Sequence, residues 1–80
     1  MVTIIGAKLN DRTHTSQNLQ KILSDHGCAI KTRIGLHEVE NGSCSSSGII
    51  LLEVINEDSA NSIINDLKAI NGIEIQSMKF

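Results

Sequence analysis

Apolar residues recur along the chain with two different periods, and each change of period marks a new element. The stretch 2–9 is rich in β-branched and apolar residues and ends at the polar run 10–12, which is typical of a strand. From Thr13 the apolar positions follow helical spacing, in one stripe: Leu19, Ile22, Leu23 and His26. Thr13 or Thr15 is expected to cap this helix, and Gly27 to end it in a left-handed conformation.

The middle of the chain alternates between apolar and polar residues. In 28–39 the alternation places Ile30, Thr32, Ile34 and Leu36 on one face and Lys31, Arg33, Gly35 and His37 on the other. The segment 40–48 is small and polar and predicts a connecting loop. The following stretch, 49–55, is the most hydrophobic predicted strand, and both its faces require partial cover.

The last third of the chain predicts a helix and a final strand. Asn56 is placed to cap the helix, with Glu57 and Asp58 in its first turn, where the helix dipole favours negative charge. The helical stripe that follows is amphipathic: Ala60, Ile63, Ile64, Leu67 and Ile70. Asn71-Gly72 ends the helix, and 73–80 is the fourth strand.

This order of elements, β-α-β-β-α-β, predicts one domain over residues 1–80 with a ferredoxin-like α+β fold. Right-handed crossovers place both helices on one face of a four-stranded antiparallel sheet. The alternation assigns to the other face a largely apolar set: Arg33, His37, Ile49, Leu51, Glu53, Met78 and Phe80. Such a face in so small a domain predicts a homo-oligomer, a dimer or tetramer, formed through the sheet. Arg33 and Glu53 are open to two interpretations: a cross-strand ion pair, or residues that set the register of the interface.

Composition narrows the classes of function. Seven basic and nine acidic residues are spread along the chain, and Phe80 is the single aromatic residue, so direct nucleic-acid binding is not expected. No apolar run has the length of a membrane span, and the start of the chain does not resemble a signal peptide, which predicts a cytoplasmic protein without membrane association. No catalytic motif is present, so an enzyme is not expected. Cys28, at the start of the second strand, is expected to be a small buried residue.

Three segments resemble a known family: Lys31–His37, Gly48–Val54, and Ile70–Ile75 with Met78–Phe80. They are similar to the iron-only hydrogenase system regulators, and the similarity covers nearly the whole chain. The resemblance implies an ACT-like, ferredoxin-like domain and a regulatory role. It also implies a relationship to the metal-binding domain of the nickel-responsive regulators, whose DNA-binding part has no counterpart in this sequence.

The same resemblance suggests metal ligands. The nickel domain uses a His-x-His pair on the second strand, a cysteine in the next loop and a histidine from another subunit. The partial matches in this chain are His37, Cys44 and His26, with one histidine where that family has two. An imidazole and a thiolate suit a transition metal ion such as Ni or Zn, and a complete site would need ligands from two subunits. The other interpretation is that these are ordinary surface residues, with His26 at a helix C-terminus where a cation is favoured.

The resemblance also points to the junction between the first strand and first helix. In ACT-like domains small effectors sit at this junction, against a neighbouring subunit, and here it contains Asn10, Asp11, Arg12 and Thr13. Backbone amides at a helix N-terminus suit a carboxylate, whereas Asp11 opposes an anion, so an ordinary polar turn is the alternative. Two main hypotheses follow: a non-enzymatic regulatory module that binds a small effector and acts on a protein partner, or a metal-binding sensor or carrier. The family name alone also suggests a third, an assembly subunit in a pathway of redox-enzyme maturation.

Overall fold

The computed structural model describes residues 2–10, 12–40 and 43–80, and their side chains in 2–10, 17–35 and 48–80. Along the chain, β1 (Thr3–Leu9) is followed by α1 (Arg12–Asp25), a short 3₁₀ turn η1 (Gly27–Ala29) and β2 (Ile30–Glu40). The second half contains β3 (Ser43–Val54), α2 (Glu57–Lys68) and β4 (Ile73–Lys79). The predicted order of elements is therefore confirmed.

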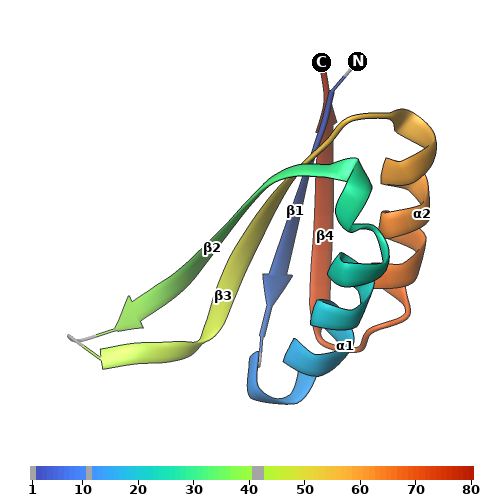
Figure 1. Cartoon of the computed structure of the whole chain (residues 1–80). Coiled ribbons are helices and arrows are strands. Elements are labelled where there is room, and N and C mark those ends of the chain that lie inside the picture. Colours follow the sequence, from blue (N-terminus) through green and yellow to red (C-terminus); the bar gives the residue numbers. More distant parts are fainter. Residues whose placement is uncertain (1, 11, 41–42) are drawn as a thin grey trace.

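The four strands form one antiparallel sheet in the order β2-β3-β1-β4. Both helices lie on the same side of this sheet (Figure 1). The fold is ferredoxin-like, as the sequence predicts. Neither helix in the described part of the chain has the length and apolar character that a membrane crossing requires.

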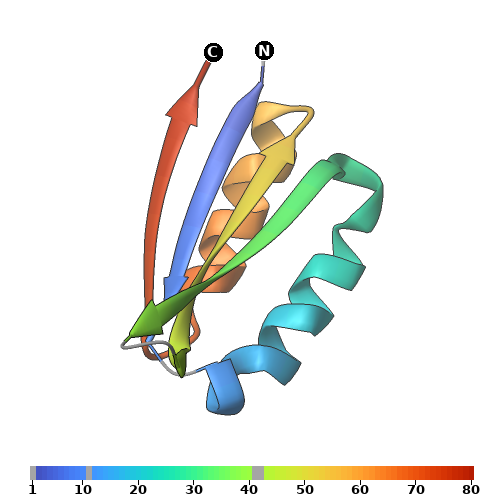
Figure 2. The same cartoon turned by 90° about the vertical axis from the view of Figure 1, so that its left-hand side faces the viewer.

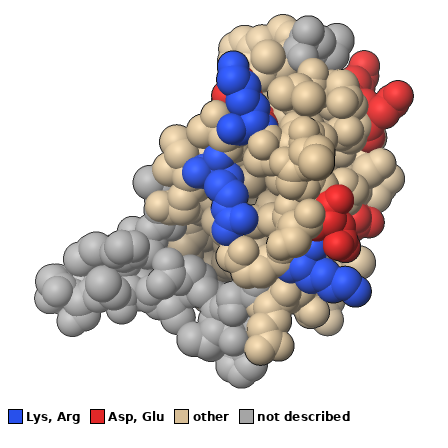
Figure 3. Space-filling view, in the orientation of Figure 1, with Lys and Arg blue, Asp and Glu red and all other residues tan. Residues whose placement is uncertain are grey.

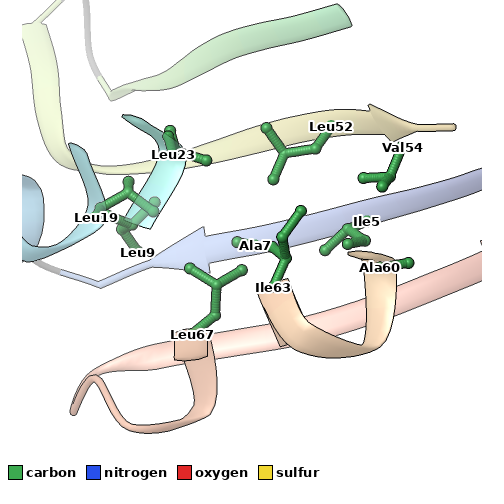
Figure 4. Close-up of a cluster of buried hydrophobic side chains, with 10 residues drawn as sticks. All are labelled: Ile5, Ala7, Leu9, Leu19, Leu23, Leu52, Val54, Ala60, Ile63 and Leu67. Carbon is green, nitrogen blue, oxygen red and sulfur yellow. The ribbon is translucent and has the colours of Figure 1, made fainter. Parts of the chain in front are cut away.

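The hydrophobic core fills the space between the helices and the sheet. Alternate residues of β1 point into it, because a strand presents every second side chain to the same face. The buried core contains ten residues, drawn in Figure 4: Ile5, Ala7, Leu9, Leu19, Leu23, Leu52, Val54, Ala60, Ile63 and Leu67. The apolar stripes predicted for the two helices contribute to this core: Leu19 and Leu23 from α1, and Ala60, Ile63 and Leu67 from α2.

Helix α2 begins and ends where the sequence predicts. The Asn56 side chain accepts a hydrogen bond from the backbone N–H of Ser59 at 2.7 Å, and so caps the first turn. Past its end, Gly72 has φ +82, a left-handed conformation that glycine adopts without steric cost. The turn around Gly72 is fixed to β1, because the Gly72 carbonyl accepts a hydrogen bond from the Asn10 backbone N–H at 3.1 Å.

Helix α1 differs from its prediction at both ends. It starts at Arg12, so Thr13 and Thr15 lie inside the helix and the prediction that either caps it is wrong. It ends at Asp25 and continues into η1, and Gly27 does not have a positive φ. A 3₁₀ turn therefore closes the helix in place of a left-handed glycine. Cys28 lies in this turn and is exposed, so the prediction of a buried cysteine is also wrong.

The segment 40–48 is the largest difference between prediction and structure. It was expected to be a loop, but β2 continues to Glu40 and β3 begins at Ser43. Backbone pairing extends to the pairs Val39↔Cys44 and Glu40↔Ser43. The two strands form a long hairpin that projects past the end of β1, visible on the left of Figure 1. Cross-strand backbone hydrogen bonds thus override the weak strand preference of a serine-rich segment.

Candidate functional site

The face of the sheet away from the helices, called the open face below, carries a broad apolar surface. Figure 2 views the molecule from this side, with α2 behind the sheet. Ile34 on β2 is 49% exposed, Met78 on β4 is 58% exposed and Phe80 is 75% exposed. Between these outer strands lie the half-buried side chains of the inner two: Ile4, Ile49 and Leu51. The apolar surface therefore spans the full width of the sheet.

Strand pairing places these residues on one face. Ile4 of β1 lies opposite both Glu53 and Met78, and its neighbours Thr3 and Ile5 are buried on the helix side. Directly opposed residues project to the same face. Phe80 extends β4 by exchanging two backbone hydrogen bonds with Val2, of 3.1 and 2.8 Å. The placement expected for Ile49, Leu51, Glu53, Met78 and Phe80 matches this register.

Arg33 was assigned to the open face, and this is wrong. A bulge between Ile30 and Thr32 shifts the register of β2, so that Arg33 lies opposite the buried Leu52. Arg33 consequently projects to the helix side, where its Nη2 donates a hydrogen bond to Oε1 of Gln20 in α1 at 2.9 Å. An extra residue in a strand inverts the faces of every residue after it, and simple alternation does not reveal the insertion.

The same bulge changes the partners of Glu53. Thr32 takes the position opposite Glu53, and its hydroxyl donates a hydrogen bond to the carboxylate at 3.0 Å. Nζ of Lys31 lies 3.9 Å from the other carboxylate oxygen. The ion pair between Arg33 and Glu53 is therefore not formed, and the acidic residue of the open face is partnered by Thr32 and Lys31.

The predicted effector junction is described in part. Asn10 is exposed at the end of β1, and its backbone is tied to the turn at Gly72. Asp11 lies outside the described residues, and so do the side chains of Arg12 and Thr13. Both of the latter belong to the first turn of α1, not to the preceding loop. The junction thus combines a helix start with the β4 turn, and its role in binding stays a prediction.

The three predicted metal ligands do not come together within one chain. His26 lies at the end of α1 before β2, and its Nε2 is 2.8 Å from Oδ2 of Asp66 in α2. His37 pairs in backbone register with Gly48, seven residues along β2 from Ile30 and so about 23 Å away at 3.3 Å per residue. The side chains of His37 and Cys44 lie outside those described. The described side chains contain no group of three metal-ligating residues. His26 therefore lies far from the strand position of His37 within one chain, and a shared site between copies stays a prediction.

Sequence reasoning missed the groove between α1 and β2. It is lined from α1 by Leu23 and Ser24, from η1 by Gly27, and from β2 by Ile30, Lys31 and Arg33. Arg33 lines the groove because the bulge brings this residue to the helix side. The contact between Arg33 and Gln20 joins residues thirteen positions apart, and neither periodicity nor a local motif indicates it.

Comparison with known proteins supports the fold. No family model matches the chain, and no curated protein matches it. Among solved structures, an uncharacterized protein from Thermotoga maritima is 19% identical, with 96% of this chain and 92% of that chain covered and a TM-score of 0.80. The divalent ion tolerance protein CutA1 from Ehrlichia chaffeensis is 11% identical, with 99% and 80% covered and a TM-score of 0.67. A dimeric ferredoxin-like protein of unknown function from Thermobifida fusca is 9% identical, with 99% and 92% covered and a TM-score of 0.52. At these identities the likeness establishes the class of fold, a small ferredoxin-like domain.

Proposed function

We propose that this chain is a non-enzymatic regulatory module that self-associates through the open face of its sheet and holds a small effector at the junction between copies. The observation that carries the proposal is the apolar surface across all four strands, with Met78 58% and Phe80 75% exposed at one edge. A contiguous exposed apolar patch on a small domain marks an interaction surface. The similarity to a dimeric ferredoxin-like protein supports a second copy as the occupant.

The size of the open face indicates how strong the association is. β1 and β4 have seven residues each, so with about 3.3 Å per residue and four strands about 4.8 Å apart the flat footprint is about 440 Å². Stable interfaces bury about 800 Å² on each partner. Because side chains project from the sheet, the accessible area of the open face is larger than this flat footprint. The open face is therefore comparable in size with a small interface, and a weak dimer is expected.

Charge on the open face favours an identical partner. Lys8 and Glu74 lie opposite each other across β1 and β4, and Glu53 is accompanied by Lys31. Among the described side chains of the open face, Glu74 and Glu53 therefore each have a basic neighbour. Two copies related by a two-fold axis would meet without a net like-charge repulsion, and the apolar residues would lie in the middle of the contact.

The regulatory part of the proposal rests on the β1–α1 junction and on the resemblance to hydrogenase system regulators. The exposed Asn10 and the first turn of α1 stand at one end of the sheet, beside the β4 turn. Backbone amides at a helix start favour an anionic group such as a carboxylate. An assembled pair of copies would supply the second wall of this site, and effector binding would then change the affinity between copies or for a protein partner.

Sedimentation velocity over the micromolar range tests the association. Wild type is expected to sediment faster as concentration rises. Met78→Glu and Ile34→Glu, at the two outer strands of the open face, are expected to remain monomeric because each buries a charge without a partner. Asn65→Glu introduces the same charge on the exposed surface of α2 and is expected to associate like wild type. Wild type that stays monomeric throughout the range would contradict the proposal, and so would association that all three variants retain.

A further inference from the structure

A groove on the helix side of the molecule has the size and chemistry of a ligand site. It lies between the C-terminal half of α1 and the start of the edge strand β2, and its volume is about 410 Å³. Sites for small molecules occupy about 300 to 1,000 Å³. In Figure 2, α1 stands beside β2 beyond the edge of the sheet, which leaves this side of β2 without a covering helix.

Glycine at position 27 keeps the groove open. A Cβ built on Gly27 would have nothing within 4 Å, so the residue faces empty space and not a packed neighbour. Leu23, which is 2% exposed, lies beneath the groove, and the partly buried Ile30 supplies apolar surface along it. A hydrocarbon chain of a ligand would remove this surface from water at the cost of little reorganisation.

Two cationic side chains stand at the rim of the groove, and none of its six lining residues is acidic. The Arg33 guanidinium is held by the neutral amide of Gln20, which orients it without neutralising its charge. Lys31 is exposed, and its Nζ forms a long ion pair, of 3.9 Å, with the Glu53 carboxylate, so Arg33 supplies the main positive charge of the groove. Figure 3 shows blue side chains over this part of the surface, with red atoms beside the upper one.

The surroundings of the groove favour a ligand with one negative charge over a ligand with two. The carbonyl groups at the end of α1 carry the negative pole of the helix dipole, which opposes a doubly charged phosphate more than a monoanion. A planar guanidinium binds a carboxylate with two parallel hydrogen bonds. Addition of a peptide strand to β2 is disfavoured, because the bulge at Lys31 and its charge are devices that protect sheet edges.

We infer that this groove binds a small monocarboxylate, whose charged group is held by Arg33 with Lys31 nearby and whose aliphatic chain lies on Ile30 beside Gly27. The groove is distinct from the proposed self-association surface, because Arg33 and α1 lie on the helix side of the sheet. Lys31, which pairs with Glu53 of the open face, is the lining residue nearest to both surfaces. The groove also lies at the end of α1 opposite to the β1–α1 junction, so the two candidate sites are separated by the length of the helix.

Nuclear magnetic resonance titration with hexanoate tests the inference. Saturable shifts are expected at the backbone amides of Ser24, Gly27, Lys31 and Arg33. Hexylamine, with the same chain and the opposite charge, is expected to produce none of these shifts, and 1-hexanol is expected to bind at least about tenfold more weakly than hexanoate.

Matched variants separate charge from shape. Arg33→Gln is expected to weaken hexanoate binding by about tenfold or more, whereas Lys68→Gln on α2 removes the same charge elsewhere and is expected to leave it unchanged. Gly27→Leu fills the groove and is expected to abolish binding. Gly35→Leu is its control, because Gly35 also has open space around it but does not line the groove.

Four results would overturn the inference. They are an absence of saturable shifts in folded wild type, shifts centred away from the groove, equal affinity for 1-hexanol, and tighter binding of inorganic phosphate than of hexanoate. Self-association is measured on the same samples. The two proposals stay distinct, because the wild-type protein can bind hexanoate without self-associating, or self-associate without binding hexanoate.

Discussion

Thr3 is a polar residue in the core whose replacement is expected to stabilise the protein. Its side chain is 1% exposed, and Oγ1 has no hydrogen-bond partner among the described residues. A buried hydroxyl without a partner costs about 1–3 kcal/mol relative to a paired or solvated one. Valine has the same branched shape, keeps the strand preference, and replaces the hydroxyl with a methyl group that gains about 0.8 kcal/mol on burial.

Thr3→Val is therefore expected to raise the free energy of unfolding by about 1–3 kcal/mol. For a domain of this size each kcal/mol shifts the midpoint of thermal unfolding by about 4–8 °C, so the change is well above measurement error. Thermal and urea unfolding followed by circular dichroism measure it. Thr3→Val and its parent are compared in the Met78→Glu background, because self-association adds a concentration-dependent contribution to stability.

Thr32→Val is the matched control for Thr3→Val. Thr32 is exposed on the open face, and its hydroxyl already donates to Glu53 at 3.0 Å. Its loss is expected to be neutral or to destabilise by up to about 1 kcal/mol. A Thr3→Val protein that is no more stable than its parent would refute the reasoning, because it would mean that the Thr3 hydroxyl is satisfied in the folded state.

Three further predictions concern the ends of α2. Asn56→Ala removes the hydrogen bond to Ser59 and is expected to cost about 1 kcal/mol in urea unfolding, with Asn56→Asp nearly neutral. Gly72→Ala forces a side chain into the left-handed conformation and is expected to cost about 1–2 kcal/mol, whereas a loss of only a few tenths would show that the turn relaxes. The Lys79 ammonium donates a hydrogen bond to Glu57 at 2.6 Å and attracts its charge, and both effects lower the pKa of that carboxyl. Because the folded pKa lies below the unfolded one, this contribution is present above the unfolded pKa, about 4.3, and is lost as the pH falls through the folded pKa. Glu57→Gln is thus expected to lower stability at neutral pH and to match wild type in strong acid, and an equal difference at both pH values would contradict the assignment.

The helices and the class of fold were predictable because their signals are local or periodic. The stripe of α2 and its Asn56 cap are both contained within fifteen residues, and burial of one face follows directly from the spacing. The placement of both helices on one face of the sheet followed from right-handed crossovers.

Alternation could not predict which face of the sheet each side chain of β2 occupies, because a bulge after Ile30 exchanges the two faces. The long hairpin did have a signal: the dipeptide Asn41-Gly42, between two stretches able to pair, is a strong indication of a two-residue connection. The serine-rich composition of 43–47 obscured it. The groove at Arg33 depends on both the bulge and a contact with α1, and so it required the three-dimensional structure.

Isotope-filtered nuclear magnetic resonance measures the contact between copies most directly. In a mixture of labelled and unlabelled wild type at high micromolar concentration, cross-peaks between different copies report which methyl groups touch. The account predicts cross-peaks that join the methyl groups of Ile34, Leu51 and Met78 to the open face of another copy. Cross-peaks confined to the helices, or none in a sample shown to be monomeric, would contradict it.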